Sequence, residues 1–230
     1  MKQNKFFILI KESGVFLSFF TYIYILVLPL VALGQAWIEQ HSWLMILFLF
    51  IGNVFYMGFL IYYFRKDLVD EWRSFRANYG KMIDISITWW FIGVTGMALS
   101  NYLISTFIPA ATPTNQELIE ANIFRFPLYM AFMTIIFAPL VEELIFRKLL
   151  RKMFRTTWLF IAVSTFTFGI CHVVTVANNW QDFVLVIPYA ILGFTFAVTY
   201  VKTKSIYAPI FTHAFHNGLL FAIIYIRYLI

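Results

Sequence analysis

Seven long apolar stretches dominate this chain of 230 residues, and they constrain its fold more than any other feature. A helix needs about 20 mainly apolar residues to cross the hydrocarbon core of a bilayer, and it satisfies its own backbone polar groups there. The pattern therefore predicts an all-α, polytopic membrane helical bundle with about seven transmembrane helices. The predicted spans are Val15–Ile38, Trp43–Phe64, Met82–Ile108, Phe124–Phe146, Thr157–Val176, Phe183–Val201 and Ile206–Ile226.

Composition excludes the main alternative classes. Hydrophobic residues make up 62% of the chain and charged residues 12%, so the charged side chains are too few to cover a soluble domain of this size. The abundance of apolar and aromatic residues excludes disorder, and the single cysteine, Cys171, excludes a disulfide framework. We expect one integral membrane domain over residues 1–230, with a motif-bearing core at about residues 124–226.

The positions of Lys and Arg predict the orientation of the chain. If the N-terminus is cytoplasmic, all but two of the 17 cations, Arg125 and Arg227, fall in cytoplasmic segments. The positive-inside rule then places the N-terminus in the cytoplasm and the C-terminus outside the cell membrane. The polar stretch Arg65–Lys81 is amphipathic enough to form a short helix on the inner surface. Because the cations are divided among short loops beside the membrane, we expect contacts with membrane lipid and no nucleic-acid partner.

Three polar clusters lie within the C-terminal spans. An ionisable side chain at hydrocarbon depth costs at least ~2.5 kcal/mol on insertion scales, and such residues usually mark functional sites. The clusters bring together carboxylates, imidazoles and an amide. They comprise Glu142, Glu143 and Arg147 in the fourth span, Phe168 and His172 in the fifth, and His213, His216 and Asn217 in the seventh.

Helix geometry separates the roles of the two adjacent glutamates. Glu143 and Arg147 are four residues apart, so they share a helical face and are expected to form a structural ion pair. Glu142 points about 100° away from Glu143 and has no partner in its own helix. A carboxylate in that position is a candidate general base.

The histidines admit a structural and a functional interpretation. His213 and Asn217 are four residues apart and stack on one helical face, and His216 lies on or beside that face. Such a polar face can simply join helices by hydrogen bonds. That interpretation explains one polar pair, but it does not explain why acid, imidazole and amide all collect in the C-terminal half. The combination favours a functional site.

These residue types suit the hydrolysis of a peptide bond. A carboxylate and an imidazole can deprotonate a water molecule, while a second imidazole and an amide can stabilise the oxyanion of the tetrahedral intermediate. Equally, Glu142, His172 and His213 are suitable ligands for a catalytic Zn2+ that leaves one position for water. The residues alone leave metal-dependent and metal-free chemistry equally open.

A shared site requires the three polar clusters to lie at one depth. His172 lies farther along its span from the nearest cytoplasmic cation than Glu142 or His213 does. We therefore predict that the segment from Arg147 to about Phe160 bends along the inner surface. That bend would bring His172 to within ~12 Å of both other groups, since catalytic groups must reach one water molecule.

At these motifs the sequence resembles the CAAX-protease and bacteriocin-processing family of intramembrane proteases, also called the Abi family. The family motifs are Glu-Glu-x-x-x-Arg, Phe-x-x-x-His and His-x-x-x-Asn on successive membrane helices. All three occur here in order, and the resemblance covers roughly Phe124–Ile226. The matching segments are Glu142–Arg147, Phe168–His172 and His213–Asn217.

The resemblance implies an intramembrane endopeptidase, of a metallo- or glutamate type, whose site opens to the cytoplasm. By position, Glu142 and His172 would activate the water, and His213 and Asn217 would stabilise the oxyanion. Phe168 and the remaining polar residues of the motifs would support the site. Relatives of the family process prenylated proteins, peptide leaders or pheromones, give immunity to bacteriocins, or act with membrane sensor kinases. The short chain without a soluble domain suggests the bacterial kind.

Two other functions fit the same sequence. The first is a non-catalytic immunity or regulatory protein that binds a peptide or a sensor kinase by helix packing. The second is a proton-coupled transporter that uses the acid and histidine groups as a relay. The seven spans show no internal repeat of the kind that transporters contain, which disfavours the second function.

Overall fold

The computed structural model describes residues 5–229, and within that range every regular element is a helix. Together with the apolar length of these helices, this confirms the predicted helical membrane bundle. Backbone contacts divide the chain into two compact units, one up to Arg65 and one from Lys66 onwards. The expectation of a single domain over residues 1–230 stays a prediction.

Among the described residues, six helical segments are long and apolar enough to cross a membrane. The fifth predicted span corresponds to a shorter apolar helix, α9 (Thr157–Cys171), which has 15 residues. At 1.5 Å per residue it is about 22 Å long, less than the ~30 Å hydrocarbon core. The six longer segments are Leu9–Leu33, Ser42–Ala77, Tyr79–Phe107, Pro127–Met153, Trp180–Thr203 and Tyr207–Arg227.

The first unit is a helical hairpin. It contains α1 (Lys5–Leu33), α2 (Gln35–Gln40) and the part of α3 (Ser42–Ala77) up to Arg65. Gly34 separates α1 from α2 with a φ of 79°, a conformation that favours glycine. The Tyr22 and Tyr56 rings stack with their centroids 3.9 Å apart, and these aromatic contacts hold α1 against α3.

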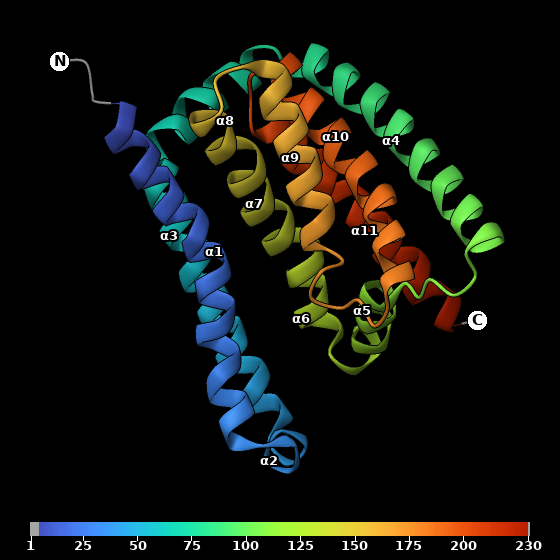
Figure 1. Ribbon diagram of the computed structural model, residues 1–230. Helices are drawn as coiled ribbons and strands as arrows, with labels where there is room; N and C mark the ends of the chain where they lie inside the picture. Colours follow the sequence, from blue (N-terminus) through green and yellow to red (C-terminus); the bar gives the residue numbers. More distant parts are fainter. Residues whose placement is uncertain (1–4, 230) are drawn as a thin grey trace. The chain divides into compact units, whose positions relative to one another are not determined.

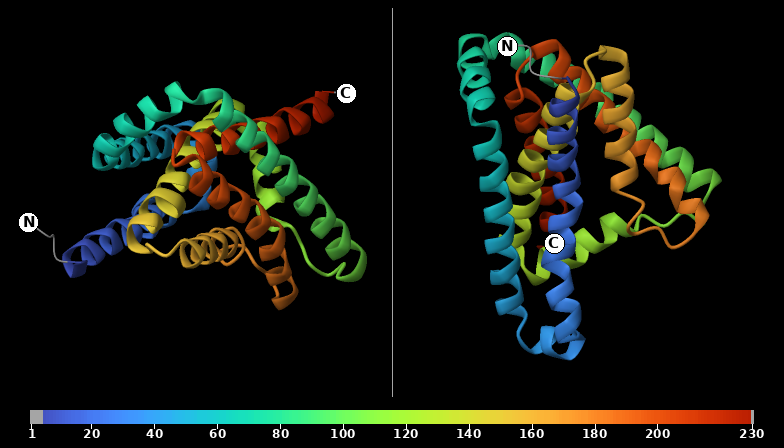
Figure 2. Two further views of the ribbon diagram at one scale, coloured as in Figure 1. Left: turned by 90° about the horizontal axis from the view of Figure 1, so that it is seen from above. Right: turned by 60° about the vertical axis from the view of Figure 1, so that its left-hand side comes forward.

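The second unit is built around α10 (Val186–Thr203), which follows the 3-10 helix η3 (Trp180–Leu185). Figures 1 and 2 show α10 between α9 and α4 (Tyr79–Phe107), and most of its side chains are buried. A Cβ on Gly169 of α9 would lie 2.9 Å from the Val186 carbonyl oxygen, so that glycine permits the close approach of α9 to α10. The unit also contains α5 (Thr114–Arg125) and α11 (Tyr207–Leu229).

The fourth span is a composite helix that begins at Pro127, because Phe124 and Arg125 belong to α5. Its first π-helical segment precedes Pro139, whose ring would clash with a carbonyl in a regular α-helix. The second π-helical segment carries Arg147. In chain order the segments are α6 (Pro127–Ala131), η1 (Phe132–Phe137), α7 (Ala138–Glu143), η2 (Leu144–Leu149) and α8 (Leu150–Met153).

The bend predicted between Arg147 and about Phe160 is wrong. The composite helix continues to Met153, and α9 begins at Thr157 after a short connection. The Ser164 hydroxyl donates a hydrogen bond to the Phe146 carbonyl (2.7 Å), so the two helices run side by side in opposite directions. Side chains tilt toward the N-terminus of their own helix. Side chains from antiparallel helices therefore lean toward each other, which reduces the difference in depth that the bend was expected to remove.

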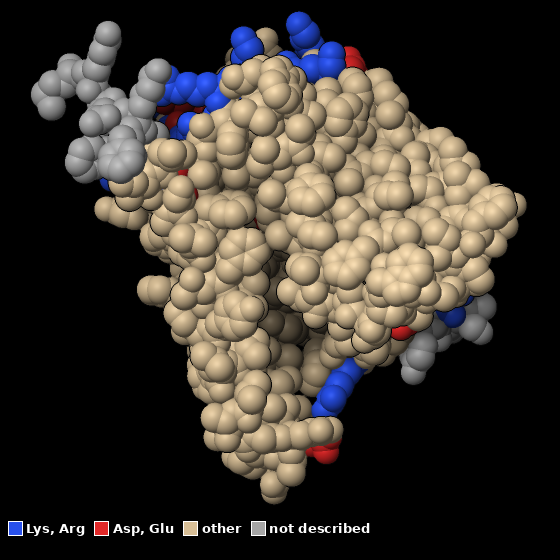
Figure 3. Space-filling model, viewed as in Figure 1, with Lys and Arg blue, Asp and Glu red and all other residues tan. Residues whose placement is uncertain are grey.

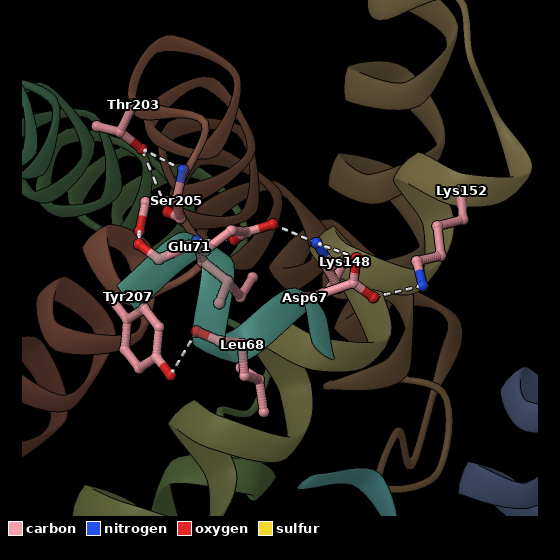
Figure 4. Close-up of polar contacts among 9 residues, drawn as sticks. Asp67, Leu68, Glu71, Lys148, Lys152, Thr203, Ser205 and Tyr207 are labelled. Carbon is pink, nitrogen blue, oxygen red and sulfur yellow. Dashed lines mark hydrogen bonds and ion pairs between the residues drawn. The ribbon is translucent and has the colours of Figure 1, made fainter. Parts of the chain in front are cut away.

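The separate surface helix predicted at Arg65–Lys81 is also wrong, because α3 continues without interruption to Ala77. Its last turns are anchored by charges (Figure 4). The Glu71 carboxylate accepts hydrogen bonds from the Lys148 ammonium and from the Ile206 N–H (2.6 Å). Asp67 forms ion pairs with Lys148 (3.4 Å) and Lys152 (2.6 Å). This segment thereby joins η2 to the start of α11.

Charged side chains of the second unit gather at one end. Figure 3 shows Lys and Arg at the top of the view, where Figure 1 places α8 and the connection to α9. The surface below is almost entirely uncharged in this view, as a lipid-facing surface requires. The arrangement agrees with a membrane protein whose basic residues flank the spans.

Candidate active site

Glu142 and His172 face each other across α7 and the end of α9. The distance between Glu142 Oε2 and His172 Nε2 is 3.7 Å, too long for a direct hydrogen bond. His172 Nδ1 lies 2.8 Å from the Phe168 carbonyl oxygen, which can only accept, so the ring hydrogen is assigned to Nδ1. In the neutral imidazole Nε2 is then an acceptor, and so is Glu142 Oε2. Two acceptors thus face each other.

Glu143 connects α7 to α11 at the centre of the unit. One carboxylate oxygen, Oε2, lies 3.1 Å from Arg147 Nε, and this ion pair was expected from the spacing. The other oxygen, Oε1, lies 2.9 Å from His213 Nδ1, 70 residues along the chain. Both partners in the ion pair are fully buried. Glu143 therefore orients the His213 ring as well as neutralising Arg147.

Arg147 and Phe168 form the floor between the two histidines. Arg147 Nη2 donates to the Gly193 carbonyl oxygen (3.1 Å), and its guanidinium lies 4.3 Å from the Phe168 ring centroid. The same ring lies 4.5 Å from the His172 ring and 5.8 Å from the His213 ring, between centroids. Both imidazoles therefore contact one phenyl group, and the three motifs meet at one place.

Asn217 is held by a carbonyl that the π-helical segment leaves unpaired by its own helix. The Ala138 N–H donates to Met133 O, five residues back. In the same pattern Thr134 O would pair with Pro139, which has no N–H. Asn217 Nδ2 donates to Thr134 O instead (2.9 Å). The amide has a second N–H, which remains available to a ligand.

His216 is buried on α11, three residues beyond His213. Its burial agrees with the predicted supporting position, and its role stays a prediction. The catalytic and supporting roles of the other motif residues are likewise proposals, whereas their mutual placement is a property of the fold.

The sequence interpretation missed the contribution of α10. Tyr189 stacks on the His172 ring (centroids 4.7 Å apart), and Phe196 stacks on the His213 ring (4.8 Å). Gly193 lies between them, and a Cβ there would lie 3.0 Å from Phe168 Cδ1. The span carries no charged residue at its centre and was therefore set aside. The spacing of Tyr189, Gly193 and Phe196 along one helical face was the available signal.

A zinc ion held by Glu142, His172 and His213 does not fit this arrangement. Among the described residues, no three His, Cys, Asp or Glu side chains are placed to hold one metal ion. His213 directs Nδ1 toward Glu143, while His172 and Glu142 form a separate pair. We therefore derive no reaction step through a metal, and its participation is left to experiment.

Comparison with known proteins gives the same family as the motifs. Residues 124–226 match the family described as Type II CAAX prenyl endopeptidase Rce1-like. A protein of Bacillus subtilis (strain 168) named "Putative membrane peptidase YdiL" is 36% identical over 91 residues, which are 38% of this chain and 34% of that protein. The match thus spans about a third of the relative's length. No solved structure matches the chain.

Proposed function

Since the motif-bearing part of this chain, residues 124–226, is of the CAAX-protease type, we propose that the protein is an intramembrane peptidase. Its substrate would be a peptide or protein held in or at the membrane, because the site is built from membrane-spanning helices. The observation that carries the proposal is the pair Glu142 and His172, with 3.7 Å between Oε2 and Nε2. Glu142 Oε2 is buried and accepts no hydrogen bond from the described residues.

A water molecule supplies what this pair lacks. It has two O–H groups, so it can donate one hydrogen bond to Glu142 Oε2 and the other to His172 Nε2. Both of its hydrogens are then engaged, and its oxygen lone pair is free to attack a peptide carbonyl carbon. As the C–O bond forms, one proton passes from the water to Glu142. The C–N bond breaks when that proton is delivered to the leaving amine.

His213 and Asn217 stabilise the oxyanion in this proposal. The amide of Asn217 offers its second N–H to the developing negative charge. His213 can donate from Nε2 only when it carries two protons, because Nδ1–H is directed at Glu143. The Glu143 carboxylate compensates that added charge, and Arg147 holds the carboxylate in place. The four residues therefore act as one unit.

The proposal also includes an orientation. We place the N-terminus in the cytoplasm, because almost all cations then lie on the cytoplasmic side. A sensor-kinase partner and a bacteriocin substrate lack support from the comparisons, and we leave them out of the proposal.

Purified protein in lipid nanodiscs tests the function. Two probes are incubated with it: a farnesylated peptide ending in a C-a-a-X sequence, and a pool of synthetic apolar peptides of the bacterial leader type. Mass spectrometry identifies new peptide termini, with and without a chelator. We expect cleavage by the wild type and by Glu117→Gln, which alters an exposed glutamate on α5, and none by Glu142→Gln. Probe binding without cleavage by any variant would favour the non-catalytic immunity or regulatory function.

A further inference from the structure

The central helix of the second unit places an aromatic ring against each site histidine. The Tyr189 ring lies nearly parallel to the His172 ring, at 21°, and the Phe196 ring lies at 23° to the His213 ring. The two aromatic residues are seven positions apart, or about two helical turns, so they share one face of α10. This face supplies no group that could take part in proton transfer at the observed positions of the rings, so its contribution is geometric.

His172 has a particular need for such a contact. It is the residue that follows the last turn of α9, and 20% of its side chain is exposed. Its Nδ1 hydrogen bond to the Phe168 carbonyl fixes one edge of the ring but permits the ring to turn about that bond. The direction of Nε2 toward Glu142 therefore requires a second contact that sets the plane of the ring.

Tyr189 is itself held in place on two sides. Its hydroxyl accepts a hydrogen bond from Asn115 Nδ2 of α5 (3.1 Å). Its backbone lies in the first turns of α10, where the neighbouring Ala190 is packed against Gly169 of α9. A Cβ on that glycine would lie 3.1 Å from Ala190 Cβ, so α10 cannot move closer to α9. The Tyr189 ring thus forms a fixed surface beside His172.

We propose that Tyr189 is a positioning residue, whose ring holds the His172 imidazole in the plane that directs Nε2 at Glu142. The inference rests on the proposed peptidase function, and it adds a residue outside the three motifs. Because a displacement of ~1 Å of a catalytic group can cost ~10²-fold in rate, loss of the ring should act mainly on the chemical step. The phenol hydroxyl is a tether for the ring and makes a smaller contribution.

The test compares substitutions that keep or remove the ring. Tyr189→Phe keeps it, Tyr189→Leu removes it, and Tyr189→Met replaces it with an apolar side chain of flexible shape. Tyr200→Leu is the matched control, since Tyr200 is a buried tyrosine of the same helix that packs on Phe160. For each variant we measure kcat and KM on the cleaved probe, the midpoint of thermal unfolding, and the rate at which diethyl pyrocarbonate modifies His172.

The proposal predicts that Tyr189→Leu and Tyr189→Met lower kcat by ~10- to 100-fold with KM unchanged. His172 is modified faster in both, and Tyr189→Phe stays within about twofold of the wild type in kcat. Tyr200→Leu lowers the unfolding midpoint and leaves the modification rate unchanged. Wild-type kcat and modification rate in both ring-free variants would overturn the proposal, as would an equal loss in Tyr189→Phe. If the wild type cleaves neither probe, the peptidase proposal fails, and the modification rates alone decide the inference.

Discussion

His213 Nδ1 lies 2.9 Å from Glu143 Oε1, and this hydrogen bond joins two helices whose sequence positions differ by 70 residues. The same carboxylate is the ion-pair partner of Arg147, which is fully buried. Glu143 therefore has a structural and a positioning role at once. Its neighbour Glu142 makes neither contact, so the two adjacent acids can be separated experimentally.

We expect Glu143→Gln to destabilise the protein strongly. The substitution leaves Arg147 charged, buried and without its carboxylate partner, and breaking a buried pair in this way costs ~3–5 kcal/mol. Unfolding of the purified protein in mixed detergent micelles measures the loss. Glu142→Gln is the matched control and should change the free energy of unfolding by less than about 1 kcal/mol, as substitutions outside packed networks do. Equal stability of the two variants would contradict the assigned roles.

Asn217→Ala should reduce the rate without unfolding the protein. Loss of an oxyanion-hole donor lowers kcat by ~10²- to 10³-fold, whereas loss of the Asn217 bond to Thr134 O costs only ~1 kcal/mol of stability. The measurement is kcat on a cleaved probe beside the unfolding free energy. Asn122→Ala serves as control, because Asn122 donates only to the Leu118 carbonyl of its own helix. A reduction in KM alone would argue against oxyanion stabilisation.

Glu71→Gln tests the anchoring of the last turns of α3. The carboxylate is 15% exposed and accepts from both Lys148 and the Ile206 N–H, so we expect a loss of ~1–3 kcal/mol in the free energy of unfolding. Asp70→Asn lies one residue away and removes an ion pair whose side chains are 77% exposed. Exposed pairs contribute little. Similar effects from the two substitutions would mean that the buried network contributes no more than a surface pair.

Membrane orientation is tested with reporters fused to the ends of the chain. The distribution of Lys and Arg predicts a cytoplasmic N-terminus and an external C-terminus. Alkaline phosphatase fused at the C-terminus should be active in a bacterial host, while green fluorescent protein at the same position should be dark. The opposite pair of signals would show that α9, the short helix, leaves the count of crossings even.

Local spacing predicted the features that depend on one helix. The apolar runs gave the helices, and the four-residue separation gave the pair of Glu143 and Arg147. The prediction failed where distant segments satisfy each other. The apolar run ends at Phe64, yet α3 continues to Ala77 because Lys148 and Lys152 neutralise its acids.

The π-helical segments and α10 were beyond the sequence for other reasons. Hydrophobic periodicity does not distinguish α from π hydrogen bonding, so the carbonyl of Thr134 that receives Asn217 could not be foreseen. The search for ionisable residues also passed over α10, whose aromatic face backs both histidines. A pattern of ring, glycine and ring on one helical face is common in ordinary packing. It became informative only when the partners of each ring were known.

The central claim is that Glu142 and His172 act together on one water molecule. A double-mutant cycle tests it directly, with kcat measured on a cleaved probe for the wild type, Glu142→Gln, His172→Gln and the double variant. General acid–base groups contribute ~10²- to 10⁴-fold each, and groups that act as a unit are not additive. The account predicts that each single variant loses nearly as much as the double variant. Losses that multiply independently, or a His172→Gln variant with the wild-type kcat, would contradict it.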